Sequence, residues 1–483
     1  MLRNFLRRFA LFAFAACTFF AIALAVPVGT ASAHNSLASS DPANGSTLSA
    51  MPTSITWVFD KSVPLETMTV TLIDVSGART ELGGSTHGPD GDTQVITPLP
   101  VLQPGPISLR WRLVGPDGHP ITDTVEFTYA APAPTTAPTS ATTAPTAPVT
   151  VPLGTTPSAT TDALTASTDD GVYVTSSVVR WVLRYGSYLA IMAAVGILFT
   201  SAFVWPGAAT NAMLRRVLSG SLVVTAISSF LQVLIVASDI SGNAPWSSFG
   251  SIDAATTTFA GMAFMIRIVL ALAMWIVLFR CRILHSDVYW TAVSLPGLGL
   301  LATWAFAGHS RSMRWPAIGV ATDVAHHAAA AAWIAGLAIV GWIIIPKTDP
   351  DVMIPAVRNF SRVATISVGV LVGTGVIQSF RLVGSPTELL AANHGRYLVA
   401  KVVILAVMLA IASANRRRVG SHLSRSSAHD RHASSLRHAI LAEFAIGLVI
   451  IGITAAMVVS PPAQGTAETG ASANARAAIS YIV

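Results

Sequence analysis

The sequence predicts two fold classes in one chain: an exported all-β sandwich or barrel, followed by an all-α polytopic membrane domain of eight transmembrane helices. The composition is 52% hydrophobic and only 11% charged, whereas about a quarter of the residues of a soluble domain are charged. Residues 34–130 contain runs that alternate between apolar and polar side chains, which is typical of half-buried strands. After residue 177, apolar segments of about 20 residues recur, and each is long enough to cross a bilayer.

Residues 1–33 have the three parts of a secretory signal peptide. Three arginines precede an apolar stretch that ends in Ala31-Ser32-Ala33, which is a small-residue cleavage site. Cleavage after Ala33 would make His34 the first residue of the mature chain. Lipidation at Cys17 and an uncleaved anchor helix are the alternatives.

Residues 34–130 are expected to form the β-domain. Ile55, Trp57 and Phe59 alternate with Thr56 and Val58, and similar runs follow. Turn signals separate the runs at Asn44-Gly45, Ser76-Gly77, Asp90-Gly91, Pro104-Gly105 and Asp117-Gly118. This spacing suits a sandwich or barrel of about 100 residues.

Residues 131–177 are expected to be an extended linker, because most of this stretch is Ala, Pro, Thr, Ser and Val. A membrane domain at 178–460 follows, with spans at roughly 178–205, 214–238, 258–283, 287–308, 318–345, 358–384, 396–415 and 438–460. Arginine and lysine gather in alternate connections, which we interpret as cytoplasmic loops. An even number of spans then places the β-domain and a tail at 461–483 on the outer side of the cytoplasmic membrane.

The net charge of +6 does not indicate a nucleic-acid partner, because the arginines flank apolar runs and so orient helices in the lipid bilayer. The sequence has no P-loop pattern, which argues against an ATP-driven pump. We expect no enzymatic activity.

Two segments of the β-domain carry possible metal ligands. A terminal His34 would offer an α-amine and an imidazole, a pair that suits Cu(II). Asp117-Gly118-His119 forms a turn signal that can bring a carboxylate and a second imidazole to one point. Asp-Gly turns are also common on protein surfaces, so an accidental arrangement is the alternative.

The β-domain resembles the CopC family of periplasmic copper-binding proteins. The resemblance rests on the stretch 34–45, the strand at 55–63, Trp111, and Asp117-Gly118-His119-Pro120. It implies a cupredoxin-like, CopC-type fold with Cu(II) bound by His34, Asp117 and His119.

Three further residues bear on copper in this domain. Some CopC-like proteins carry a methionine-rich Cu(I) site, but this domain has only Met51 and Met68, so we expect no such site. His87 is either an extra ligand or a solvated histidine in a glycine-rich loop.

Ionisable side chains inside the predicted spans indicate a second site. Asp323 lies three residues before His326 and four before His327, so its carboxylate can orient one imidazole ring. His309, at the end of the preceding span, can complete a copper-binding site at the outer face. Met262 and Met265 add thioethers that suit Cu(I), although such residues more often pack.

The membrane domain resembles the CopD family of copper-transport proteins over roughly residues 178–460. The resemblance is carried by Gly308-His309-Ser310, His326-His327 with Trp333 and Gly336, Phe360-Ser361 through Val376, Gly395-Arg396-Tyr397 with Lys401, and Pro461-Pro462-Ala463. It implies passage of copper, as Cu(I) or Cu(II), across the inner membrane toward the cytoplasm, with exported copper carriers as possible partners. We expect the linker to concentrate copper at the membrane domain, so that severing it lowers uptake at limiting copper.

Two other functions are compatible with the same residues. A haem clamped between His309 and His326 would make the protein a transmembrane electron carrier. A copper-binding receptor that transports nothing would need the same ligands.

Overall fold

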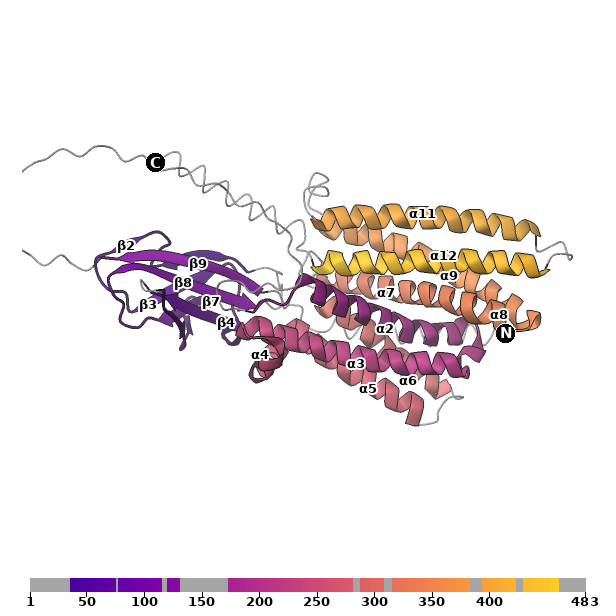
Figure 1. The fold of residues 1–483 in the computed structure, drawn as a ribbon, viewed down its shortest axis with the longest axis horizontal. Helices are drawn as coiled ribbons and strands as arrows, with labels where there is room; N and C mark the ends of the chain where they lie inside the picture. Colours follow the sequence, from indigo (N-terminus) through magenta and orange to yellow (C-terminus); the bar gives the residue numbers. More distant parts are fainter. Residues whose placement is uncertain are drawn as a thin grey trace, which may run out of the picture.

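The computed structural model describes residues 35–74, 77–114, 120–130, 173–280, 287–307, 315–382, 393–422 and 429–459. They form a β-domain and a helical bundle that lie end to end (Figure 1). The expected signal peptide, most of the expected linker and the expected tail lie outside the described residues. We call the end of the bundle next to the β-domain the near end, and the opposite end the far end.

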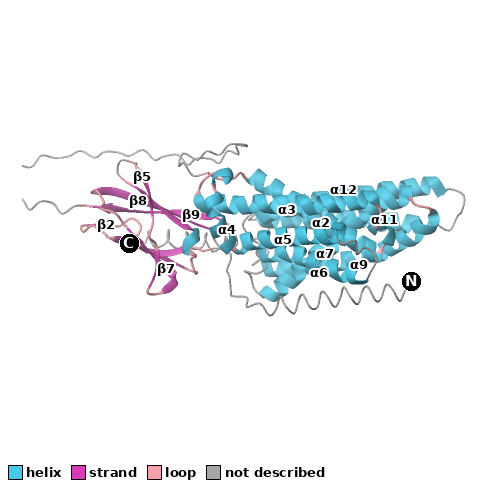
Figure 2. Cartoon of the chain, turned by 90° about the horizontal axis from the view of Figure 1, so that it is seen from below, coloured by secondary structure: helices cyan, strands magenta, loops and turns pink. Residues whose placement is uncertain are grey.

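The β-domain contains two sheets. The first has the order β1 (Leu37–Asp41), β3 (Ser54–Phe59), β7 (Gly91–Pro98), β6 (Thr86–Gly88). The second has the order β2 (Thr47–Leu48), β9 (Pro120–Tyr129), β8 (Gly105–Val114), β4 (Met68–Ile73), β5 (Arg79–Leu82), and a 3-10 turn, η1 (Leu65–Thr67), precedes β4. Figure 2 shows these strands at one end of the molecule and the helices at the other.

The period-two alternation places one set of side chains between the two sheets. Ile55, Trp57 and Phe59 of β3 are buried together with Trp111 and its alternate neighbours on β8. The Phe59 and Trp111 rings meet edge to face, with centroids 5.1 Å apart. The all-β prediction for this domain is therefore confirmed. The alternating pattern corresponds to one buried and one outer face of each strand, because successive side chains of a strand point to opposite faces.

The bundle consists of long apolar helices. They are α2 (Ser177–Phe203), α3 (Ala212–Ser241), α5 (Phe259–Arg280), α6 (Asp287–Ala307), α7 (Pro316–Ile339), α9 (Pro350–Leu382), α11 (Asn393–His422) and α12 (His429–Val459). The short helices α4 (Ile252–Thr257) and α8 (Ile345–Lys347) and the π-turn Val340–Ile344 lie between them. Among the described residues, seven helices are long and apolar enough to cross a membrane, and Pro296–Phe306 of α6 is a shorter apolar helix.

Helices α2 and α7 approach closely because small residues line their contact. A Cβ atom on Gly196 would lie 2.2 Å from the Cβ of Ala335 and 2.5 Å from the carbonyl oxygen of Ala331. Close helix packing through small residues is common in membranes.

Candidate functional site

His326 lies on α7, about 15 Å along the helix from its near end. Its Nδ1 is 2.9 Å from the hydroxyl oxygen of Thr374 on α9. The Thr374 hydroxyl donates its own hydrogen to the carbonyl oxygen of Val370, at 2.6 Å. It must then accept from His326, which assigns the proton to Nδ1 and leaves the lone pair on Nε2.

His327 has the same tautomer for a different reason. Its Nδ1 lies 2.8 Å from the backbone carbonyl oxygen of Asp323, which can only accept a hydrogen bond. The Asp323 carboxylate was expected to orient one ring, but its Oδ1 is 3.5 Å from the same nitrogen. That Oδ1 accepts a 3.2 Å hydrogen bond from Gln378. The orienting group is therefore mainly the backbone carbonyl, because a helix places the carbonyl of residue i next to the side chain of residue i+4.

The two imidazoles are neighbours but point in different directions. Their centroids are 6.1 Å apart and their planes are inclined at 76°. His326 faces α9, whereas His327 packs against Trp304 of α6, with ring centroids 4.7 Å apart. In the neutral form of each ring the lone pair is on Nε2, and no described residue donates a hydrogen bond to it. This is the form of imidazole that ligates metals.

A third ligand for this site is not among the described residues. Within the described ranges, no group of three His, Cys, Asp or Glu side chains gathers where it could hold a metal ion. His309, the expected third histidine, lies outside them. The three-histidine site therefore stays a prediction.

Met262 and Met265 lie in the first two turns of α5. Their side chains are 42% and 38% exposed on the outside of the bundle. Helix α5 packs against α3, α4 and α6. Methionines at such positions often only pack, and as copper ligands Met262 and Met265 stay a prediction.

Arg267 of α5 was not identified as part of this region from the sequence. It is fully buried, and its Nε donates to Thr303 at 2.8 Å while Nη1 donates to Ser187 at 3.4 Å. Its guanidinium also lies 5.9 Å from the centroid of the Trp304 ring, which contacts His327. The buried Arg267 guanidinium and His327 thus both contact Trp304, and cation–π attraction to this ring partly replaces the hydration of the guanidinium.

The expected Cu(II) ligands His34, Asp117 and His119 lie outside the described residues, but the residues that flank them are described. Asn35 donates from its amide to the carbonyl oxygens of Lys61 and Ser62, both at 3.2 Å. These contacts hold the start of the domain against the end of β3. Because Phe59 of β3 packs on Trp111 of β8, the flanks of all three ligands lie at one end of the sandwich.

The two strands around the expected copper turn are paired up to its edges. Val114, the last residue of β8, is opposite Pro120, the first residue of β9. The backbone flanking Asp117 and His119 is therefore fixed. This arrangement is compatible with a metal site at that turn.

His87 lies on β6 and not in the expected loop. Its Nε2 is 2.9 Å from the carbonyl oxygen of Val63, and its Nδ1 is 3.9 Å from the Asp92 carboxylate. The Val63 carbonyl oxygen accepts a hydrogen bond from Nε2, so in the neutral ring the lone pair is on Nδ1. As a copper ligand, His87 stays a prediction.

Three protein-family profiles match this sequence. They are described as CopC domain over residues 37–130, Copper resistance protein D-like, N-terminal domain over 175–315, and Copper resistance protein D over 354–457. The two-sheet domain, the apolar helices and these matches define a multi-pass membrane protein of the copper resistance and transport class.

Individual relatives identify the family within this class. The chain is 24% identical to the copper transport protein CutJ of Bacillus subtilis (strain 168), over 90% of this chain and 75% of that protein. It is 35% identical to copper resistance protein C of Pseudomonas syringae pv. tomato, over 20% of this chain and 81% of that protein. The crystal structure of CopC from Methylosinus trichosporium OB3b covers 20% of this chain and 95% of its own, at 22% identity and a TM-score of 0.19. The chain belongs to the family that joins CopC and CopD regions in one polypeptide.

Proposed function

We propose that this chain binds copper with its β-domain outside the cytoplasmic membrane and carries it through the helical bundle into the cytoplasm. The observation that carries this proposal is the hydrogen bonding of His326 and His327. Both rings have Nδ1 as donor, so in the neutral rings both Nε2 atoms have a lone pair that no described residue of the bundle occupies. An unpaired polar group in hydrocarbon is costly, which favours a ligand at this position.

The β-domain would bind one Cu(II) through the amine and imidazole of His34, the carboxylate of Asp117 and the imidazole of His119. Two observations support a shared site: Asn35, which follows His34, is hydrogen-bonded to Lys61, and strands β8 and β9 are paired up to Val114 and Pro120 on either side of the Asp117-Gly118-His119 turn. Oxygen and nitrogen donors of this kind suit the tetragonal geometry of Cu(II). In the bundle, copper would bind His309, His326 and His327 as Cu(I) or Cu(II).

We place the protein in the cytoplasmic membrane with eight spans and with the near end of the bundle outside. Basic residues at the far end support this orientation: Arg215, Arg216, Arg280, Lys347, Arg358, Arg437 and the run 416–418. Positive residues gather on the cytoplasmic side of membrane proteins. The signal peptide would be cleaved after Ala33, and the linker and tail would lie outside.

The proposed Cu(II) site can be tested at His34, the N-terminus that cleavage after Ala33 would create. Adding one residue before His34 removes the free α-amine from the chelate, so Cu(II) affinity should fall by an order of magnitude or more. Titration of the purified protein with Cu(II), followed by its visible absorption, measures this change. Unchanged affinity in the extended variant would refute the ligand set.

The membrane site is tested with the double variant His326→Ala, His327→Ala. We expect copper uptake into proteoliposomes to be lost while the yield and melting temperature of the protein stay near those of the wild type. His438→Ala is the matched control, because His438 makes the same bond to a carbonyl four residues back but is exposed on α12. Wild-type uptake by a well-folded double variant would refute transport through this site, and a Soret band in the purified protein would favour the haem alternative.

A further inference from the structure

Two side chains on β8 are buried although they point away from the core of the β-domain. Trp111 and Leu113 face the core, so Arg112 and Val114 face the opposite side of the sheet. Yet Arg112 is only 8% exposed and Val114 is 0% exposed. A second body must therefore cover this end of the sheet.

That body is the near end of the helical bundle. Val114 packs in an apolar cluster whose other buried members come from α3, α4 and α5: Val233, Val236, Ala237, Ile240, Ala255, Ala260 and Phe264. The contact joins the last residue of a β-strand to three helices. Removing this surface from water or lipid headgroups stabilises the contact in proportion to its apolar area.

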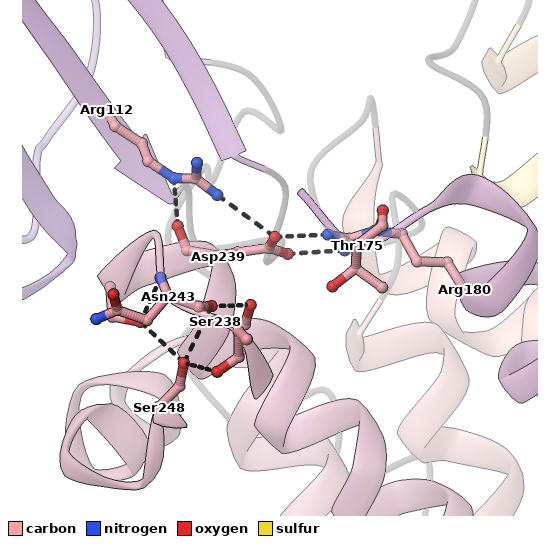
Figure 3. Close-up of polar contacts among 9 residues, drawn as sticks. Arg112, Thr175, Arg180, Ser238, Asp239, Asn243 and Ser248 are labelled. Atoms are coloured by element: carbon pink, nitrogen blue, oxygen red, sulfur yellow. Dashed lines mark hydrogen bonds and ion pairs between the residues drawn. The ribbon is translucent and has the colours of Figure 1, made fainter. Parts of the chain in front are cut away.

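A buried ionic network lies beside this cluster (Figure 3). Asp239, in the last turn of α3, is 0% exposed. Arg180 of α2 donates to both of its carboxylate oxygens, from Nη1 at 2.7 Å and from Nη2 at 2.5 Å. Arg112 of the β-domain lies 3.5 Å from one of these oxygens through Nη2, and its Nε donates to the backbone carbonyl oxygen of Asp239. One carboxylate thus bridges the two parts of the chain.

The energetics make this contact specific. Burial lowers the pKa of the Arg112 guanidinium, and the Asp239 carboxylate opposes that effect. A buried charge is tolerated only when its ionic partner and hydrogen bonds are in place. Separating the domains would break the ion pair between Arg112 and Asp239 and the bond to the Asp239 carbonyl oxygen. The backbone bond at the C-terminal end of α3 is also favourable, because a cation there complements the helix dipole.

We propose that Asp239 is a docking residue that holds the β-domain at a fixed position on the near end of the bundle. The partner of the β-domain is therefore the near end of its own chain's bundle, formed there by α2, α3, α4 and α5. Copper would pass between two parts held in constant geometry, and the linker would not need to guide the β-domain by diffusion. The docking contact is independent of the proposed function, which supplies only the cargo.

The test uses the full chain with a protease site inserted in the linker between residues 131 and 172 and an affinity tag at the C-terminus. After cleavage in detergent and without copper, we measure the fraction of β-domain that stays with the tagged bundle. The wild-type sequence should retain most of it, whereas Arg112→Ala should lower the retained fraction about tenfold. Arg110→Ala is the comparison variant, because Arg110 lies two residues earlier on the same face of β8, and its removal should lower retention less than Arg112→Ala does.

Asp239→Asn tests the other side of the contact and should also release the β-domain. Because Asp239 also binds Arg180, the melting temperature of the uncleaved variant shows whether the bundle itself is intact. Should that variant unfold, Val114→Asp provides a second test, since it places an unpaired charge in the apolar cluster without touching Arg180. Release of the wild-type β-domain, or equal retention by the wild type and Arg112→Ala, would overturn the proposal. A docked but transport-inactive protein would count against the proposed function alone.

Discussion

The chemistry of the two buried histidines depends on single neighbouring atoms. The Thr374 hydroxyl accepts a hydrogen bond from Nδ1 of His326, and the Asp323 carbonyl oxygen accepts one from Nδ1 of His327. In the neutral form of each ring, the lone pair is then on Nε2. Without these acceptors the neutral rings could exchange tautomers or rotate. Groups that hold a ligating histidine in this way commonly change metal affinity by 10–100-fold when they are removed.

Thr374→Val should therefore lower copper uptake about 10-fold or more while preserving the fold, because valine has nearly the same shape but cannot accept the proton of His326. Thr365→Val is the control, since the Thr365 hydroxyl also bonds to a carbonyl four residues back on α9 but is exposed. Uptake assays on proteoliposomes that contain equal amounts of each variant measure the effect. Equal rates for the two variants would show that Thr374 does not position His326.

Helix α7 combines the histidines with a small-residue face. The same helix that presents His326 to α9 packs through Ala331 and Ala335 against Gly196 of α2. The depth and rotation of the histidines therefore depend on this close contact. If α7 moves away from α2, the positions of the His326 and His327 rings change with it.

Gly196→Ala should destabilise the protein by about 1–3 kcal/mol, because the new Cβ would overlap Ala335 and force the helices apart. Gly186→Ala on the same helix meets no atom within 4 Å and should be neutral or stabilising by up to about 1 kcal/mol. Thermal unfolding of the purified variants in detergent compares the two. A Gly196→Ala protein that melts with the Gly186→Ala protein would show that α2 and α7 are not tightly packed.

Across the whole molecule, the linker and the docking contact are two separate connections between the β-domain and the bundle. The sequence suggested that the linker tethers the β-domain and so concentrates copper at the membrane domain. The buried contacts of Arg112 and Val114 add a noncovalent connection at the near end. This changes the expected result of severing the linker.

We now expect that cutting the linker leaves copper uptake at limiting metal nearly unchanged in the wild type. In the Arg112→Ala background, the same cut should lower uptake to the level of a bundle without a β-domain, because the cut removes the second connection. Uptake by cleaved and uncleaved proteoliposomes of both proteins gives the four values needed. A large loss in the cleaved wild type would mean that the linker, and not the docking contact, delivers the metal.

The sequence by itself determined the classes of structure and the helical spacing of the candidate site residues on α7. Period-two alternation in β3 and β8, long apolar runs, and the spacing of Asp323 before His326 and His327 are all local patterns, and the backbone repeats of strands and helices translate them directly into faces. The resemblance to copper proteins rested on equally local motifs. These predictions needed no knowledge of how distant segments meet.

Only the tertiary structure decided the partners that give these residues their roles. Thr374 is 48 residues from His326, and Arg112 is 127 residues from Asp239. The tertiary structure also left the side chains of Met262 and Met265 partly exposed. It showed that the backbone carbonyl of Asp323, rather than its carboxylate, lies closest to the His327 ring. The physical reason is that a side chain's partner depends on the packing, rotation and depth of separate helices and sheets, which the periodicity of one segment does not specify.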